Sequence, residues 1–219
     1  TGSTAAVKSY GLFGYASYQG QPWYLDLSLG AVQLQYDTQR EINFPGFNSV
    51  ADGNHDGMQY IAAARAGYPI ELGHHTVLTP IAGLIYSTLD EDSFTESGGN
   101  GAALHVDSTN THSLKSDLGT RLERSFATSY GNVVPSAQLS WRHEYQDTRL
   151  QSVSNFAVDT SGATSFSSPG ARPVDDTRVL VLGVTVLRSG TLSLSTKYTL
   201  EAASRYTANT GDMQVSWDF

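Results

Sequence analysis

Charged side chains recur at every second position within several apolar stretches of this chain. In the stretch 112–126, Lys115, Asp117, Arg121 and Glu123 alternate with leucine, serine and threonine. A period of two places such residues on one face of a β-strand. Acids and bases on a shared face can pair and hold a shape, or they can line a path for water or a polar chain, and both roles stay open here. The candidates with this placement are Asp26, Arg65, Lys115, Asp117, Arg121, Glu123, Arg142, Glu144, Lys197 and Glu201.

Other reactive residue types do not form a catalytic or metal-binding pattern. His105, Asp107 and His112 could be imagined as metal ligands in a loop, but a fourth ligand and support from a regular element are missing. We interpret them, and the acidic run 90–92, as solvated residues. The chain also lacks a Gly-x-Ser-x-Gly elbow, a His-Glu-x-x-His helix and a phosphate-binding glycine loop. We therefore expect no catalytic residue, no metal site and no cofactor.

Composition limits the class of protein further. The 219 residues are enough for one large all-β domain, which we place at 1–219. The net charge of −8, without a cluster of Lys and Arg, argues against a nucleic-acid partner. The chain has no cysteine, which excludes disulfides and thiolate metal sites. It also lacks the run of about 20 apolar residues that a membrane-spanning helix needs.

Apolar residues alternate with polar residues along most of the chain, which predicts about nine β-strands. Each is long enough for the ~9–11 residues of a tilted membrane strand, apart from the shorter last stretch. The expected strands are 7–18, 23–40, 56–72, 77–96, 112–126, 133–145, 174–187, 191–201 and 213–219.

The connections between these strands alternate in length. Short turns follow the first, third, fifth and seventh strands, whereas longer polar segments cover 41–55, 97–107, 146–172 and 202–210. Transmembrane barrels have short turns at one rim and longer loops at the other, and an up-and-down order of antiparallel strands produces this alternation. The pattern therefore favours an up-and-down antiparallel transmembrane β-barrel.

Aromatic residues gather near the two ends of the expected strands. A bilayer selects two such girdles because amphipathic rings settle at the depth of the headgroups. The alternative explanation, that Tyr and Trp favour strands in general, accounts for their number but not for their sorting. The predicted girdle residues are Tyr18, Trp23, Tyr68, Phe126, Trp141, Tyr145, Trp217 and Phe219.

The final stretch has bulky apolar residues at alternate positions, namely Met213, Val215, Trp217 and Phe219. We expect this face to contact lipid. An exposed strand edge is also a template for strand addition by another protein. This stretch is therefore a candidate recognition signal as well as a membrane surface.

Short motifs in a fixed order cover essentially the whole chain. The chain resembles the C-terminal β-barrel (translocator) domain of autotransporters, the type V secretion proteins of Gram-negative bacteria. The residues that carry the resemblance are Tyr10-Gly11, Tyr15-Ala16-Ser17-Tyr18, Trp23-Tyr24-Leu25-Asp26, Tyr36-Asp37-Thr38, Arg40, Ala66-Gly67-Tyr68, Leu78-Thr79-Pro80, Ala82-Gly83-Leu84, Phe94-Thr95-Glu96-Ser97-Gly98, Leu118-Gly119, Trp141-Arg142-His143-Glu144 and Phe219.

The resemblance implies about twelve strands and an inner helix that plugs the pore. The chain begins Thr1-Gly2-Ser3 and holds about nine expected strands, so we expect the helix and about three strands to be absent from it. Unpaired strand edges are not tolerated in lipid. Either an upstream part of the protein or the barrel-assembly machinery is expected to cover them. A smaller self-closed barrel is conceivable, although single-chain bacterial barrels usually have even strand numbers.

The function implied by the resemblance is a non-enzymatic anchor in the Gram-negative outer membrane that supports secretion and surface display of an N-terminal passenger. The expected partners are outer-membrane lipid and lipopolysaccharide, the passenger, and the barrel-assembly machinery, which would read the signal Met213, Val215, Trp217 and Phe219. Two other functions stay open: an outer-membrane diffusion pore and a soluble β-rich adhesin domain.

Overall fold

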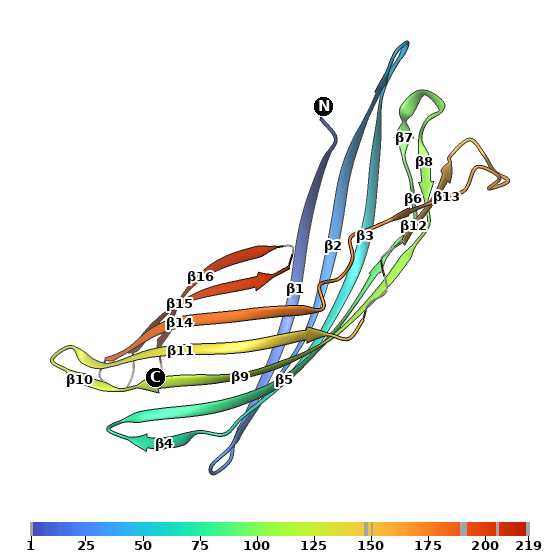
Figure 1. Ribbon diagram of the computed structural model, residues 1–219. Coiled ribbons are helices and arrows are strands. Elements are labelled where there is room, and N and C mark those ends of the chain that lie inside the picture. The colour runs from blue at the N-terminus through green and yellow to red at the C-terminus, as the bar shows by residue number, and fades with distance from the viewer. Residues whose placement is uncertain (1, 147–148, 150, 189–191, 205, 218–219) are drawn as a thin grey trace.

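The computed structural model describes residues 2–146, 149, 151–188, 192–204 and 206–217, and most of them lie in β-strands (Figure 1). Within these ranges the helical structure is a single 3-10 turn, η1 (Gly99–Gly101). No helix in them is long and apolar enough to cross a membrane.

The main sheet follows the chain in an up-and-down order, as predicted. Each strand pairs antiparallel with the next in the path. Figure 1 shows the sheet curved into a half-barrel, and no pairing joins its two edge strands within the described ranges. The nine strands of the path, in order, are β1 (Thr4–Gln19), β2 (Tyr24–Phe44), β3 (Phe47–Gly67), β5 (Thr76–Glu91), β9 (Thr109–Arg124), β11 (Gly131–Glu144), β14 (Asp176–Arg188), β15 (Leu192–Ala203) and β16 (Thr207–Trp217).

Shorter strands extend this sheet or form a second one. Outside the path, β4 (Ile70–Gly73) pairs with β5, β7 (Ser97–Gly98) with β3, and β10 (Phe126–Thr128) with β11. A separate sheet lies beside the long-loop end of the half-barrel (Figure 1) and has the order β13-β12-β8-β6. Its strands are β6 (Phe94–Thr95), β8 (Leu104–Val106), β12 (Gln151–Phe156) and β13 (Phe166–Pro169).

The large apolar residues of the main sheet do not form a core. Leu139 is 67% exposed and Met213 is 77% exposed. In a water-soluble protein, an apolar surface of this extent would be covered by another layer. Period-two alternation puts these residues on one face and many of the charged residues, including Asp117 and Arg142, on the other, so the sheet has a mainly apolar outer face and a polar lumenal face. The buried hydrophobic residues of the described ranges are Ala51, Ile81, Ala103 and Val179.

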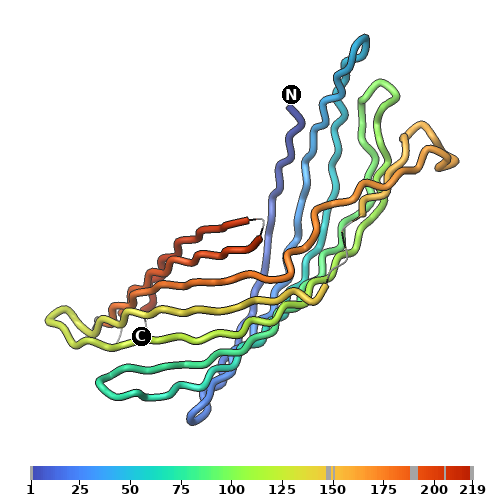
Figure 2. The backbone as a smooth tube through the Cα atoms, viewed as in Figure 1, coloured from blue at the N-terminus to red at the C-terminus, as the bar shows by residue number. Residues whose placement is uncertain are grey.

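The prediction of a long loop at 41–55 is wrong. Strands β2 and β3 continue through it in unbroken register as far as the pair Phe44 and Phe47, and Figure 2 shows this hairpin rising beyond its neighbours. The turn consists of Pro45 and Gly46, whose φ of +87° is one that glycine adopts without strain. Asp52 and Gly53, residue types that favour turns over strands, lie within the paired part of this extension, so the sequence there resembles a loop although the backbone pairing persists.

Two other predicted loops also contain strands. Residues 97–107 include β7 and β8, and the described part of 146–172 includes β12 and β13. The register pairs Ser154 with Val106, which joins the two loops through backbone hydrogen bonds. These strands are only 2, 3, 6 and 4 residues long, which is too short for an alternating pattern to be recognised in the sequence.

Strand ends differ from the predictions in three further places. The predicted third strand breaks after Gly67, because Pro69 has no amide hydrogen to donate to the ladder, and β4 forms separately. The fourth strand ends at Glu91 rather than at 96. The last strand begins at Thr207, earlier than expected, and the predicted signal residue Phe219 lies outside the described residues.

Candidate lumenal site

Polar residues of the lumenal face form one continuous row across the sheet. Each member is the direct register partner of the next, from the first strand to the seventh. Adjacent strands lie about 4.8 Å apart, so side chains in such a row can reach their neighbours. In order from β1 to β14, the lumenal row is Ser17, Asp26, Arg65, Gly83, Asp117, Arg142 and Thr177.

Arg142 of β11 links two carboxylates in this face. Its Nη2 lies 3.1 Å from Asp117 Oδ2, and its Nη1 donates to Glu201 Oε1 at 2.8 Å. Glu201 belongs to β15, and the intervening strand presents the small side chain of Thr177 at the register position of Arg142. The Arg142 side chain is 23% exposed, so the pair of contacts is largely shielded from solvent.

Glu144, at the end of the same strand, is a second ionic centre. Its side chain is 6% exposed, and its Oε2 lies 3.7 Å from Lys115 Nζ, the residue opposite it in the register. The Ser113 hydroxyl donates to Oε2, and the Leu114 amide donates to Oε1 at 3.0 Å. These bonds satisfy a buried carboxylate that would otherwise be costly.

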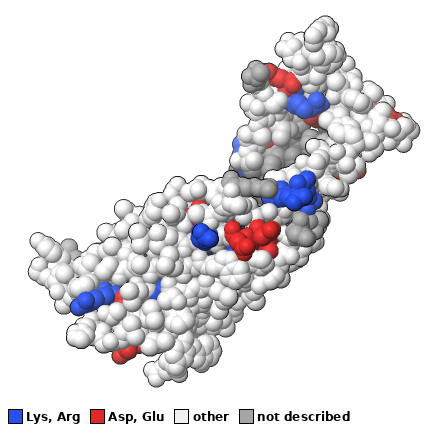
Figure 3. Space-filling view, viewed as in Figure 1, with Lys and Arg blue, Asp and Glu red and all other residues white. Residues whose placement is uncertain are grey.

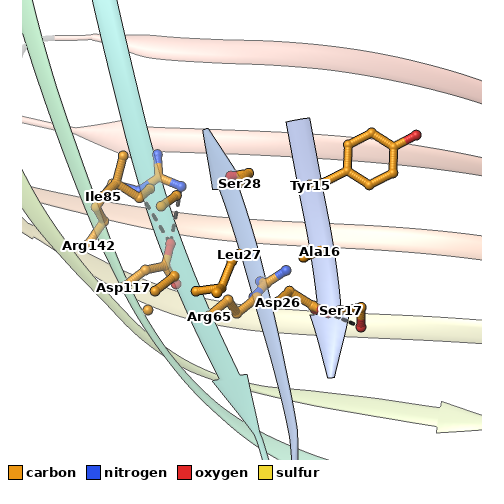
Figure 4. A pocket seen from close by; sticks show the side chains of 13 residues that line it. Tyr15, Ala16, Ser17, Asp26, Leu27, Ser28, Arg65, Ile85, Asp117 and Arg142 are labelled. Carbon is orange, nitrogen blue, oxygen red and sulfur yellow. Dashed lines mark hydrogen bonds and ion pairs between the residues drawn. The ribbon is translucent and has the colours of Figure 1, made fainter. Parts of the chain in front are cut away.

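A cavity of about 430 Å³ lies in the trough of the sheet between β1 and β11. Figure 4 shows Asp26 and Arg65 on one side of it and Asp117 with Arg142 on the other. Asp26 accepts a hydrogen bond from Ser17 Oγ at 2.7 Å. Arg65 has no ion pair or hydrogen bond with any described residue, and Asp117 Oδ1 is buried without a partner among them.

The structure brings only part of the predicted polar set together. Asp26, Arg65, Asp117 and Arg142 line the cavity, and Glu201 joins them through Arg142. The remaining predicted lumenal residues lie apart from it. Arg121 and Glu123 pair with each other at 2.9 Å on β9, Lys115 and Glu144 form the second centre, and Lys197 lies opposite Gly183 and Asp212 in the register.

The predicted girdle residues within the described ranges are all well exposed. Tyr18 and Trp23 contact each other, with ring centroids 5.1 Å apart. Phe126 lies under the Arg124 guanidinium at 4.9 Å, and Tyr145 donates from its hydroxyl to Ser116 Oγ. The remaining members, at both ends of the sheet, are Tyr68, Trp141 and Trp217.

The candidate signal residues lie on the outer face of β16, which is an edge of the sheet in the described ranges. Met213, Val215 and Trp217 are 77%, 65% and 68% exposed. Their register partners on β15 include Leu194 and Leu192, so the apolar surface continues onto the neighbouring strand. The strand therefore offers both an apolar face and a free edge.

Sequence reasoning missed an ionic contact outside the main sheet. Arg40 Nε and Nη2 donate to the two oxygens of Glu96, at 2.9 and 2.5 Å, and Nη2 also donates to the Ala102 carbonyl. The Glu96 side chain is only 8% exposed. Residues 56 positions apart carry no sequence signal for such a contact. It fastens the 92–107 segment to the β2–β3 hairpin.

The histidines considered as metal ligands do not meet. His105 lies near Asp107 and Thr95, whereas His112 contacts Tyr86 on the outer face. His55, which sequence reasoning did not single out, stacks between Tyr36 and Phe94. The described residues contain no group of three or more metal-ligating side chains.

Chemically, the lumenal arrangement provides fixed ion pairs and a polar trough. Figure 3 shows charges gathered in a few places on an otherwise uncharged surface.

Comparison with known proteins agrees with this geometry. Residues 1–199 match the model of the autotransporter beta-domain family. The chain is 24% identical over 216 residues to Esterase EstA of Pseudomonas aeruginosa and to Esterase EstA of Pseudomonas putida. These matches cover 97% of the chain but only 33% of each esterase, so the chain spans about a third of the length of these relatives.

Solved structures share the fold at low sequence identity. The translocator domain of the autotransporter NalP from Neisseria meningitidis superposes with a TM-score of 0.76 and 18% identity, covering 100% of this chain and 70% of that one. The beta domain of the Bordetella autotransporter BrkA gives 0.65 and 23%, covering 98% and 75%. The transport unit of AIDA-I from Escherichia coli gives 0.61 and 11%, covering 99% and 84%. With the family match over residues 1–199, these observations show that the chain belongs to the autotransporter β-domain family.

Proposed function

We propose that this chain is the translocator part of an outer-membrane protein, which anchors a passenger and supports its secretion to the cell surface. The observation that carries the proposal is the contrast between the two faces of one sheet. The outer face exposes leucine, methionine and aromatic side chains, whereas the lumenal face holds the row around Asp117 and Arg142. Lipid suits the first face, and water or a polar chain suits the second.

A polar lumen matters for secretion because it keeps charged groups out of hydrocarbon. A segment that crosses along the row finds hydrogen-bonding partners, such as the Arg65 guanidinium, instead of leaving its backbone unsatisfied. The free energy for transport cannot come from ATP in the periplasm, so folding of the passenger outside the cell is the proposed driving term. We assign the domain no enzymatic reaction. The esterase activity in the names of the relatives would belong to the other two thirds of their length.

The last strand supports a proposal about assembly. Edges of a sheet in lipid leave backbone groups unpaired, at a cost of several kcal/mol each, so β1 and β16 need pairing partners in the membrane. The edge strand β16 carries Met213, Val215 and Trp217 on its outer face. We propose that the barrel-assembly machinery recognises this strand by strand addition during insertion.

Surface display of a passenger tests both parts of the proposal. Deleting residues 217–219 in the full-length protein should abolish insertion and display. A control, Tyr130→Ala, removes another exposed aromatic residue, in the β10–β11 turn, and should leave display intact. Normal insertion of the deletion variant would refute the signal assignment, and insertion without display of any passenger would refute the translocator assignment.

A further inference from the structure

The outer face of the sheet contains a groove that differs from its apolar surroundings. Its volume is about 400 Å³, and it crosses β9, β11, β14 and β15 near the long-loop end. Two adjacent register rows form it. In one row Trp141 pairs with Arg178, and in the other Leu139 pairs with Leu180, which pairs in turn with Leu200.

The two rows differ in chemistry and in depth. Leu139, Leu180 and Leu200 lie farther along their strands from the long loops, and they give the groove an apolar floor. Trp141 and Arg178 lie one step nearer to those loops and place an indole and a guanidinium at the upper end. The groove is therefore apolar at its lower end and polar at its upper end. A membrane lipid has the same arrangement, with its acyl chain below its polar headgroup.

Arg178 has no ion pair or hydrogen bond with any described residue, although it is exposed on a lipid-facing surface. A cation on that face is unfavourable at depth, and near the interface it is favourable when an anion is present. The neighbouring carboxylate on this face, Asp176, is occupied elsewhere: Trp141 Nε1 donates to it at 2.8 Å, and His143 Nδ1 lies 3.0 Å away. The guanidinium is therefore left with its donors facing the bilayer surface.

We propose that this groove binds a phosphorylated lipid of the outer leaflet, with one acyl chain along Leu139, Leu180 and Leu200 and the phosphate on Arg178. A guanidinium presents two parallel N–H donors that match a phosphate better than a zwitterionic headgroup. The inference rests on the membrane placement in the proposed function, but not on passenger secretion.

Fluorescence quenching in lipid discs tests the site on the full-length protein. Substituting Trp23→Phe and Trp217→Phe leaves Trp141 as the indole of this chain, and phenylalanine keeps an aromatic ring at the signal position 217, so insertion should be retained. Phosphatidic acid with brominated acyl chains should quench it at about tenfold lower concentration than phosphatidylcholine with the same chains. Arg178→Gln should remove this preference. Leu180→Asn should weaken quenching by both lipids.

Lys8→Gln is the matched control, because Lys8 is the cation of β1 on the outer face and its side chain is 66% exposed. Equal quenching by the two lipids, or the same loss of preference in the Lys8 variant, would overturn the proposal. Relief of quenching by millimolar inorganic phosphate would show a headgroup site without an acyl groove and would also overturn it.

Heat-modifiable mobility on gels confirms that each variant is folded. The Arg178 variant should display its passenger normally, so loss of display in the parent protein would count against the proposed function and not against this site.

Discussion

Asp117 and Arg142 face each other across adjacent strands, and only one oxygen of the carboxylate is used. Arg142 Nη2 lies 3.1 Å from Asp117 Oδ2, whereas Oδ1 is buried without a partner in the described part of the chain. The same guanidinium holds Glu201 at 2.8 Å. One arginine thus neutralises two carboxylates that approach it from opposite sides, and it connects β9, β11 and β15 through side chains as well as through the backbone ladder.

Arg142→Gln should destabilise the domain by about 3 kcal/mol, because it leaves two shielded carboxylates without their cation. Urea unfolding of the full-length protein in detergent measures the change. Arg121→Gln is the control, since its contact with Glu123 is more exposed and should contribute less than about 1 kcal/mol. Equal losses from the two variants would show that Arg142 has no special role.

Substitution by alanine should affect stability differently at two lumenal glycines, Gly83 and Gly119. A Cβ at Gly83 would lie 3.4 Å from the nearest atom, which is ordinary contact, so Gly83→Ala should change stability by less than about 0.5 kcal/mol. A Cβ at Gly119 would lie 2.6 Å from the Leu139 carbonyl oxygen. Gly119→Ala should therefore cost about 1–3 kcal/mol. Thermal unfolding of the two variants side by side gives the comparison, and a neutral Gly119 variant would contradict the close packing of β9 against β11.

Arg40→Gln should release the 92–107 segment from the β2–β3 hairpin without unfolding the sheet. The variant removes both donors from a Glu96 carboxylate whose side chain is 8% exposed. Because Arg40 itself is 35% exposed, we expect an effect on the order of 2 kcal/mol. Hydrogen exchange should become faster at Leu104, whose amide donates to Glu96, and stay unchanged at Ala137 in β11. Unchanged exchange at Leu104 would contradict the clamp.

The loop around Asp159 should resist acid. Hydrogen bonds from Ser161 and from Thr164 hold the pKa of Asp159 well below its ordinary value. A lowered pKa means that the carboxylate stabilises the loop fully above the ordinary aspartate pKa of about 3.9, and that this contribution disappears as the pH falls through the lower folded value. Amide exchange at Ser161 and Thr164, corrected for intrinsic rates, should therefore stay protected at pH 4, whereas Asp159→Asn should lose protection at neutral pH. Loss of protection in the parent protein between pH 6 and 4 would contradict this assignment.

The sequence predicted the strands of the main sheet because apolar and polar residues alternate along them, as they do in strands that span a membrane. Leu118 and Leu122 on β9, each directly preceded by a charged residue (Asp117 and Arg121), show the pattern clearly. The same reasoning failed at 41–55 because residues that favour turns, such as Asp52 and Gly53, lie inside the paired strands there, and by residue type they cannot be told from a loop.

The lumenal site was predictable as a face but not as a set of contacts. Parity along each strand placed Asp26, Arg65, Asp117 and Arg142 on the polar side. Register across strands decides which of them are neighbours, and residue types alone do not show which turn residues set that register. Gly83, which separates Arg65 from Asp117 in the lumenal row, and the second ionic centre at Glu144 therefore became visible only in three dimensions.

Solvent accessibility along β15 tests the central claim most directly, namely that lipid covers one face of this sheet and water or protein the other. The chain has no cysteine, so spin labels can be attached at Leu194→Cys and Ser195→Cys in the full-length protein in bilayers. The account predicts that dissolved oxygen relaxes the label at Leu194 and that a water-soluble nickel complex relaxes the label at Ser195. Protection of the Leu194 label from both reagents, as in a protein core, or the reverse accessibility, would contradict it.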